Sequence, residues 1–143
     1  GSEMCIRDRF YERLEPAVFV LRLVPGMRAD IIPLLAPHYR ALVLESFGVG
    51  GLPGGEHGEM FAALRRWCES GRLAVFTTQV PHEGCDLAVY EVGRAVGELP
   101  GVLEARDMTP EAVAVKLMWA LGQTEDREKA ARLFETPIEY DIM

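Results

Sequence analysis

Short apolar runs alternate along this chain with segments of helical periodicity, and this alternation restricts the fold more than any other feature. Runs rich in Val, Leu and Phe occupy residues 18–23, 41–44 and 73–78, and a shorter run occupies 102–104. Each reads as a strand, and the intervening segments carry apolar residues three or four positions apart. Strands separated by single helices favour a parallel sheet. The sequence therefore predicts a three-layer, flavodoxin-like α/β fold with a roughly four-stranded parallel sheet and helices on both faces.

The helix boundaries follow from local signals. The predicted helices occupy residues 29–35, 57–70, 91–98, 109–122 and 126–135. In the first of them we expect Leu34 to lie on the buried face. Gly71 stands where a C-terminal cap belongs, and Thr109 is an N-cap candidate. Gly122 is expected to cap the end of the helix that Thr109 begins.

Length and charge limit the classes of partner. The chain has 143 residues, the size of a single domain, and its 15 Lys and Arg against 22 Asp and Glu give a net charge of −7. An acidic domain has no electrostatic reason to bind nucleic acid or anionic lipid. The strongest apolar run, around residues 17–24, is too short to span a bilayer and contains Arg22. We expect neither a nucleic-acid partner nor a membrane.

The cysteines and the N-terminus bear on compartment and domain limits. Three cysteines form no Cys-x-x-Cys pair, and no long apolar stretch of a secretory signal opens the chain. We therefore expect a cytoplasmic protein with reduced thiols. Gly1-Ser2 resembles a cloning remnant, and residues 3–9 resemble a translated adapter. We treat residues 1–9 as an artefactual leader and residues 10–143 as one domain.

Ligand-binding loops of such sheets gather at the carboxyl ends of the strands. The glycine loop that begins at Gly48 follows a strand and precedes a helix, which is the place of a dinucleotide fingerprint. Its third glycine is replaced by Pro53, and the lysine of a phosphate-binding loop is absent. The loop is then a tight turn that needs glycine dihedrals, or a turn that lets the backbone of a partner come close.

The residues alone offer no complete catalytic constellation. No histidine pair has metal-ligand spacing, so no metal is expected, and no G-x-S-x-G elbow occurs. We expect the hydroxyl of Thr77, at the end of a strand, to bond the local backbone. Asp86 with Glu83 is either a carboxylate pair or a solvated loop face. Tyr90 is either a core residue with a satisfied hydroxyl or a group presented to a site.

Four segments resemble one family. Residues 18–27, residues 41–50 with their Gly-Val-Gly loop, Thr78-Gln79 followed by Tyr90-Glu91-Val92-Gly93, and residues 107–112 with Lys116-Leu117 occur in the order and spacing of that family. From about Leu14 to the C-terminus, the chain resembles the C-terminal domain of cytoplasmic, type I bacterial L-asparaginases.

This resemblance implies a function and an assembly. Family members are two-domain, oligomeric amidohydrolases that convert asparagine to aspartate and ammonia without a metal or organic cofactor. Their nucleophilic threonine belongs to an N-terminal domain whose motifs do not occur in this sequence. The chain then looks like the C-terminal domain alone, inactive by itself. Its implied partners are the N-terminal domain and a neighbouring subunit of a homo-oligomer, whose active site it completes.

The resemblance also assigns residues. Tyr90 matches the loop tyrosine that approaches the nucleophile of the neighbouring subunit, which makes it an accessory catalytic residue in trans. Asp86 lies where some members place a polar or acidic group near the substrate amine. Gly51 stands where many members carry an asparagine that approaches the substrate or an effector. Glu45 replaces an arginine and Val80 a cysteine of other members, and these two departures together with Gly51 predict that an asparagine-sensing allosteric pocket is absent.

Two other functions remain open. The asparaginase-like subunit of an archaeal glutamyl-tRNA amidotransferase has a similar domain. A free-standing α/β module for binding or dimerisation, with no enzymatic partner domain, is an alternative of a different class. A catalytic domain encoded upstream in the same reading frame distinguishes these possibilities.

Overall fold

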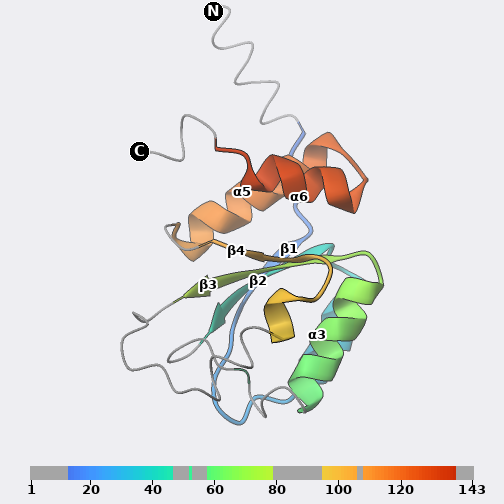
Figure 1. Cartoon of the computed structure of the whole chain (residues 1–143), viewed down its shortest axis with the longest axis vertical. Coiled ribbons are helices and arrows are strands. Elements are labelled where there is room, and N and C mark those ends of the chain that lie inside the picture. Colours follow the sequence, from blue (N-terminus) through green and yellow to red (C-terminus); the bar gives the residue numbers. More distant parts are fainter. Residues whose placement is uncertain (1–12, 47–51, 53–57, 79–94, 106–107, 138–143) are drawn as a thin grey trace, which may run out of the picture.

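The computed structural model describes residues 13–46, 52, 58–78, 95–105 and 108–137. In chain order they form β1 (Val18–Arg22), α2 (Ile31–Leu35), β2 (Ala41–Ser46), α3 (Glu59–Glu69), β3 (Leu73–Thr78), β4 (Val102–Glu104), α5 (Pro110–Gln123) and α6 (Arg127–Glu135), as Figure 1 shows. All four predicted strands are confirmed. Of the helix predicted over 91–98, the structure describes residues 95–98, and residues 95–97 form a single helical turn. No helix among the described residues is long and apolar enough to cross a bilayer.

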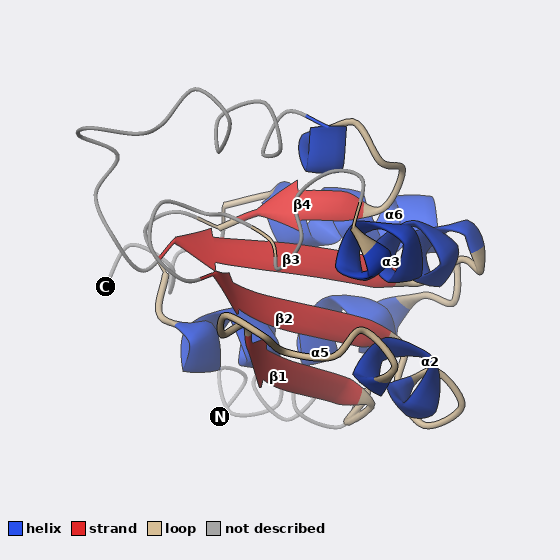
Figure 2. Ribbon diagram, turned by 90° about the horizontal axis from the view of Figure 1, so that it is seen from below, coloured by secondary structure: helices blue, strands red, loops and turns tan. Residues whose placement is uncertain are grey.

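The sheet is parallel, and its strand order β1-β2-β3-β4 follows the sequence. In register, Val18 lies beside Ala41, Ala41 beside Leu73, and Ala74 beside Val102. Because every crossover steps in the same direction, right-handed connections place α2 and α3 on one face. The opposite face is covered by α5 and α6, which follow the last strand (Figure 2). The predicted three layers are confirmed, and this strand order explains how the helices divide between the faces.

Each face of the sheet has its own core cluster. Side chains of β2 and β3 alternate between the two faces, and the central residues of both strands are buried on both sides. The α2/α3 cluster includes Leu42, Leu44, Ala74, Leu64 and Trp67. The α5/α6 cluster includes Ala41, Val43, Leu73, Val75, Val113, Leu117 and Phe134. The sheet is therefore the shared middle layer of two hydrophobic cores.

The buried face of α2 differs from the prediction. Ile32 and Leu35 are buried, whereas the Leu34 side chain is 66% exposed. Residues three apart share a face of a helix, and Leu34, two positions after Ile32, points away from that face. Pro33 is tolerated because it lies in the first turn, where its missing N–H has no intrahelical acceptor. A helix of five residues has too few positions for its sequence pattern to fix this face.

The start of α5 confirms the prediction, but its end does not. The Thr109 hydroxyl oxygen accepts a 3.2 Å hydrogen bond from the Ala112 N–H, as an N-cap should. Gly71 after α3 has the expected positive φ, +90°. Gly122, however, lies inside α5, and Thr124 caps the helix. A Cβ atom at Gly122 would overlap the carbonyl oxygen of Arg13, so close approach of another segment explains this glycine.

Candidate functional site

The carboxyl ends of the four strands meet at one edge of the sheet, where the arrowheads of Figure 1 point. Beyond β2 and β3 the chain runs into residues 47–57 and 79–94, which hold the predicted site residues. Gly51, Val80, Asp86 and Tyr90 lie outside the described residues, so their contacts stay predictions. Leu52, which follows Gly51 in the sequence, is buried in the α2/α3 cluster.

A row of polar residues crosses the sheet just before this edge. Arg22 pairs in register with Glu45, and Glu45 with Thr77. By strand alternation this row lies on the face that α5 and α6 cover. Thr77 is 3% exposed, and its hydroxyl donates a 3.3 Å hydrogen bond to the carbonyl of Leu44. We predicted a bond to the local backbone, whereas this bond crosses to the neighbouring strand β2, 33 positions away in the sequence, because parallel pairing lays β2 beside β3.

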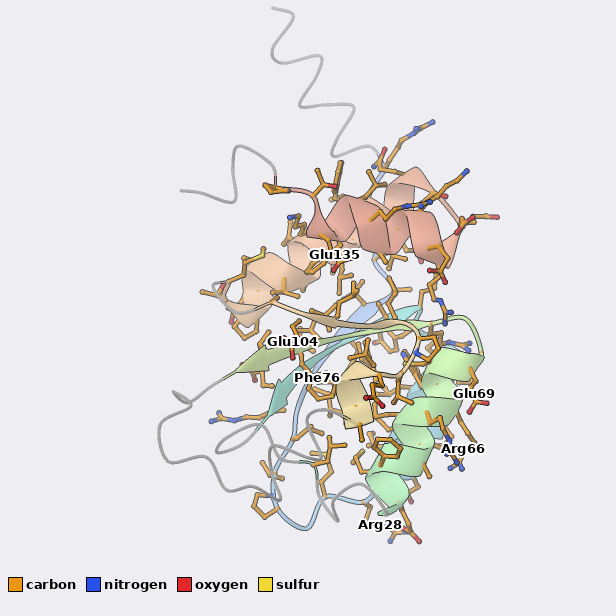
Figure 3. All side chains as sticks on the ribbon, in the orientation of Figure 1. Arg28, Arg66, Glu69, Phe76, Glu104 and Glu135 are labelled. Atoms are coloured by element: carbon orange, nitrogen blue, oxygen red, sulfur yellow. The ribbon has the colours of Figure 1, made fainter. Side chains whose placement is uncertain are left out.

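Glu45 and Glu104 add negative charge near the edge. Glu45 is half-buried, and its carboxylate stands where the resemblance has an arginine. Glu104 on β4 lies beside Phe76 of β3, its register partner (Figure 3). A ligand carboxylate placed next to Glu45 would meet repulsion where an arginine would attract it. Within the part of the chain that the structure describes, no group of three or more His, Cys, Asp or Glu is placed to hold a metal ion.

The opposite, amino edge contains a cavity of about 230 Å³ lined by Arg40, Arg72 and Arg127 among others. Each guanidinium bonds a carbonyl at the end of a helix. Arg72 donates to Ala36 at 2.6 Å, Arg40 to Leu121 at 3.3 Å, and Arg127 to Cys68. The carboxyl end of a helix carries partial negative charge. These contacts show that the three arginines have a structural role. The sequence alone did not identify them.

The Cys68 side chain is also explained by structure. It is a free thiol with no exposed surface, on the last turn of α3. Burial raises its pKa to about 11, against the opposing effect of the Arg127 guanidinium, and Glu69 adds a smaller increase. A buried thiol with a raised pKa is a poor nucleophile. Cys68 therefore offers no alternative catalytic centre.

Comparison with known proteins identifies relatives of the whole domain. The family profile of the Glutaminase/Asparaginase C-terminal domain matches residues 17–134. An L-asparaginase of Thermococcus kodakarensis is 38% identical over 99% of this chain and 45% of its own length. A subunit of the glutamyl-tRNA(Gln) amidotransferase of Metallosphaera sedula is 36% identical over 87% of this chain and 27% of its own length. The chain thus spans less than half of these relatives.

Solved structures give the same result. The thermostable L-asparaginase from Thermococcus kodakarensis superposes with a TM-score of 0.72 at 38% identity, over 87% of this chain and 37% of that one. L-asparaginase I from Vibrio cholerae superposes with a TM-score of 0.67 at 27% identity, over 87% of this chain and 36% of that one. The predicted α/β fold of an asparaginase C-terminal domain is confirmed.

Proposed function

Because the chain belongs to the Glutaminase/Asparaginase C-terminal domain family, we propose that it serves as the C-terminal domain of an L-asparaginase, which hydrolyses asparagine to aspartate and ammonia. The observation that carries this proposal is 38% identity to an L-asparaginase over 99% of the chain. The four motifs noted above favour the cytoplasmic type I branch of these enzymes. Residues 10–143 would form this domain, and the nucleophilic threonine would come from a domain that precedes it.

The described geometry supports a role for this domain at the active site of a neighbouring subunit. The chain enters β1 at the amino edge, beside the end of α5, where the Glu15 N–H donates to the Met118 carbonyl. Residues 79–94 leave β3 at the carboxyl edge. A six-residue strand is about 20 Å long, so the two points lie at opposite ends of the sheet. A domain that precedes Arg13 would join this domain at the amino edge, whereas the sequence that holds Tyr90 continues from the end of β3 at the carboxyl edge. This separation of the two points supports a second subunit as the target of Tyr90.

Three residues that follow β2 or β3 in the sequence receive roles in this proposal. The Tyr90 hydroxyl donates a hydrogen bond that orients or polarises the threonine nucleophile of the neighbouring subunit. The Asp86 carboxylate accepts a hydrogen bond from the substrate amine. Gly51, which has no side chain, leaves room where other members place an asparagine against the substrate. No metal or organic cofactor takes part in this scheme.

The Tyr90→Phe substitution in the complete protein tests the proposal. It keeps the ring and removes only the hydroxyl, so we expect kcat to fall by about tenfold to a thousandfold. The melting temperature should stay nearly unchanged, and the 143-residue chain alone should release no ammonia from asparagine. If Tyr90→Phe lowers the melting temperature by several degrees and leaves kcat intact, Tyr90 is a core residue. Asparagine turnover by the isolated chain would contradict the proposal itself.

The second candidate is an amidotransferase subunit, because glutamyl-tRNA(Gln) amidotransferase subunits of several archaea are 30–36% identical to this chain. The L-asparaginase is preferred on its higher identity, 38%, and because this chain spans more of its length, 45% against 27% and 30% for two of the amidotransferase subunits. The complete protein, purified alone, distinguishes the two. We expect it to hydrolyse free asparagine without a second kind of subunit, whereas an amidotransferase subunit would need its partner and a charged tRNA.

A further inference from the structure

Residues 13–16, here called the incoming segment, lie against α5 before the chain enters β1. The Glu15 N–H donates a 2.9 Å hydrogen bond to the Met118 carbonyl. The Gln123 side-chain amide donates to the Arg13 carbonyl at 3.3 Å and to the Trp119 carbonyl at 3.0 Å, so α5 itself holds this amide in place. Between these contacts the Arg13 carbonyl oxygen approaches the backbone of Gly122 so closely that no Cβ atom would fit.

Helix propensity makes this glycine informative. Glycine in the interior of a helix is less favourable than alanine because the unfolded chain loses more conformational freedom at that position. Gly122 lies in the last turn of α5, one residue before its end, and its φ is not among the positive φ angles of the described glycines, so the helix end does not require a glycine here. The close approach of the Arg13 carbonyl is therefore the structural requirement that Gly122 meets.

We propose that Gly122 is a positioning residue that docks the incoming segment on α5 and thereby fixes the direction in which the preceding chain reaches the domain. The docked backbone arrives at the amino edge, beside Arg40 and Leu121. In the asparaginase proposed above, and resting on that proposal, this contact sets the point at which the catalytic domain is attached. The recognition is of backbone rather than of side chains, since all the contacts described involve main-chain atoms of the incoming segment.

The docking is separable from the fold of the domain. Arg13 is exposed, Leu14 and Glu15 are half-buried, and none of them belongs to either core cluster. Releasing the segment should therefore leave the sheet and its two cores intact. A test can therefore distinguish docking of the incoming segment from a role of Gly122 in the stability of the whole domain.

The test compares Gly122→Ala with Gly97→Ala in the 143-residue chain. Gly97 is the matched control, because a Cβ at that position meets nothing within 4 Å. Amide hydrogen exchange at Glu15 and tryptic cleavage after Arg13 report on docking, and exchange at Leu42 to Leu44 reports on the sheet. We expect Gly122→Ala to accelerate both docking readouts at least tenfold, with sheet exchange unchanged, and Gly97→Ala to change neither.

Unchanged exchange and cleavage in Gly122→Ala would overturn the proposal, and so would an equal loss of protection at Glu15 and in β2. If Gly122→Ala fails to fold, Gln123→Ala serves instead, because it removes the amide that bonds the Arg13 and Trp119 carbonyls and leaves the bond from Glu15 to Met118 in place. We then expect cleavage after Arg13 to become severalfold faster. An unchanged cleavage rate would contradict the docking. These readouts do not depend on asparagine turnover, so failure of the proposed function would not produce the same result.

Discussion

Among single residues, Cys68 shows most directly how the fold changes the pKa of a side chain. Its thiol is completely buried beneath the last turn of α3, and this burial raises its pKa from 9.0 to about 11. The Arg127 guanidinium, which bonds the Cys68 carbonyl, opposes the shift without cancelling it. The thiol therefore stays protonated across the neutral range.

This pKa shift predicts a dependence of stability on alkaline pH. Between pH 9 and about 11 the folded state keeps the thiol proton, whereas the unfolded state loses it. Stability is therefore fully present below pH 9 and falls as the pH rises through this window, by at most about 1.4 kcal/mol per pH unit. Urea unfolding at pH 8, 9 and 10 should show a shallower loss in Cys68→Ala than in the parent chain. Parallel profiles for the two proteins would contradict this prediction.

At the scale of elements, the described helices α2, α3, α5 and α6 share one kind of hydrogen bond at their carboxyl ends. In each helix a basic side chain from another part of the chain donates to a carbonyl of the last turn or of the C-cap. For α6 this side chain is Lys116, which donates to the Thr136 carbonyl at 3.0 Å. Lys116 is 8% exposed and lies 5.4 Å from the centre of the Phe134 ring. Such contacts satisfy orphan carbonyls and offset the negative end of the helix dipole. They also join elements that are distant in sequence.

Arg72 is the most connected of these cations and provides the next prediction. It donates to Tyr39 at 3.0 Å and to Ala36 at 2.6 Å, and it lies over the Trp67 ring at 5.3 Å. Arg72→Met should lower the free energy of unfolding by about 2 kcal/mol, because it leaves two carbonyls without their charged donor.

The matched control is Arg65→Met on α3, which removes an exposed arginine that pairs with Glu69 at 3.6 Å. An exposed ion pair of this kind contributes less than about 1 kcal/mol. Urea denaturation followed by circular dichroism measures both variants. Equal destabilisation by the two substitutions would show that the bonds of Arg72 to the Ala36 and Tyr39 carbonyls add no stability.

The elements that the sequence predicted well are those with local signals. The strands follow from β-branched apolar runs, and the start of α5 follows from Thr109 next to Pro110. The role of Gly122 was missed because Arg13, whose carbonyl it contacts, is remote in the sequence. The hydrogen bond from Gln123, the next residue, to the same carbonyl spans 110 positions. The bond from Arg40 to Leu121 joins residues 81 positions apart and leaves no local pattern either. The roles proposed for Tyr90 and Asp86 rest on the resemblance, because the residue pattern left two interpretations open for each and both lie outside the described residues.

For the molecule as a whole, the sheet shared by two cores predicts one cooperative unfolding transition. Each core contains or contacts one tryptophan: Trp67 belongs to the α2/α3 cluster, and Trp119 packs against the α5/α6 cluster. Fluorescence of Trp67→Phe reports on the α5/α6 side, and that of Trp119→Phe reports on the other side. After correction for the stability change of each variant, measured by circular dichroism, we expect each fluorescence midpoint to coincide with its dichroism midpoint. Separate transitions would show that the two layers unfold independently.

The strand order has a consequence for synthesis on the ribosome. All strands and the helices of one face are encoded before residue 106, whereas the other face waits for α5 and α6, encoded by residues 110–135. At about 5–20 residues per second, that wait lasts roughly one to five seconds, during which Val43, Val75 and their neighbours on that face have no helices to cover them. Residues 110–135 of the nascent chain therefore close an apolar surface that faces the chaperones of the cell until these two helices have been made.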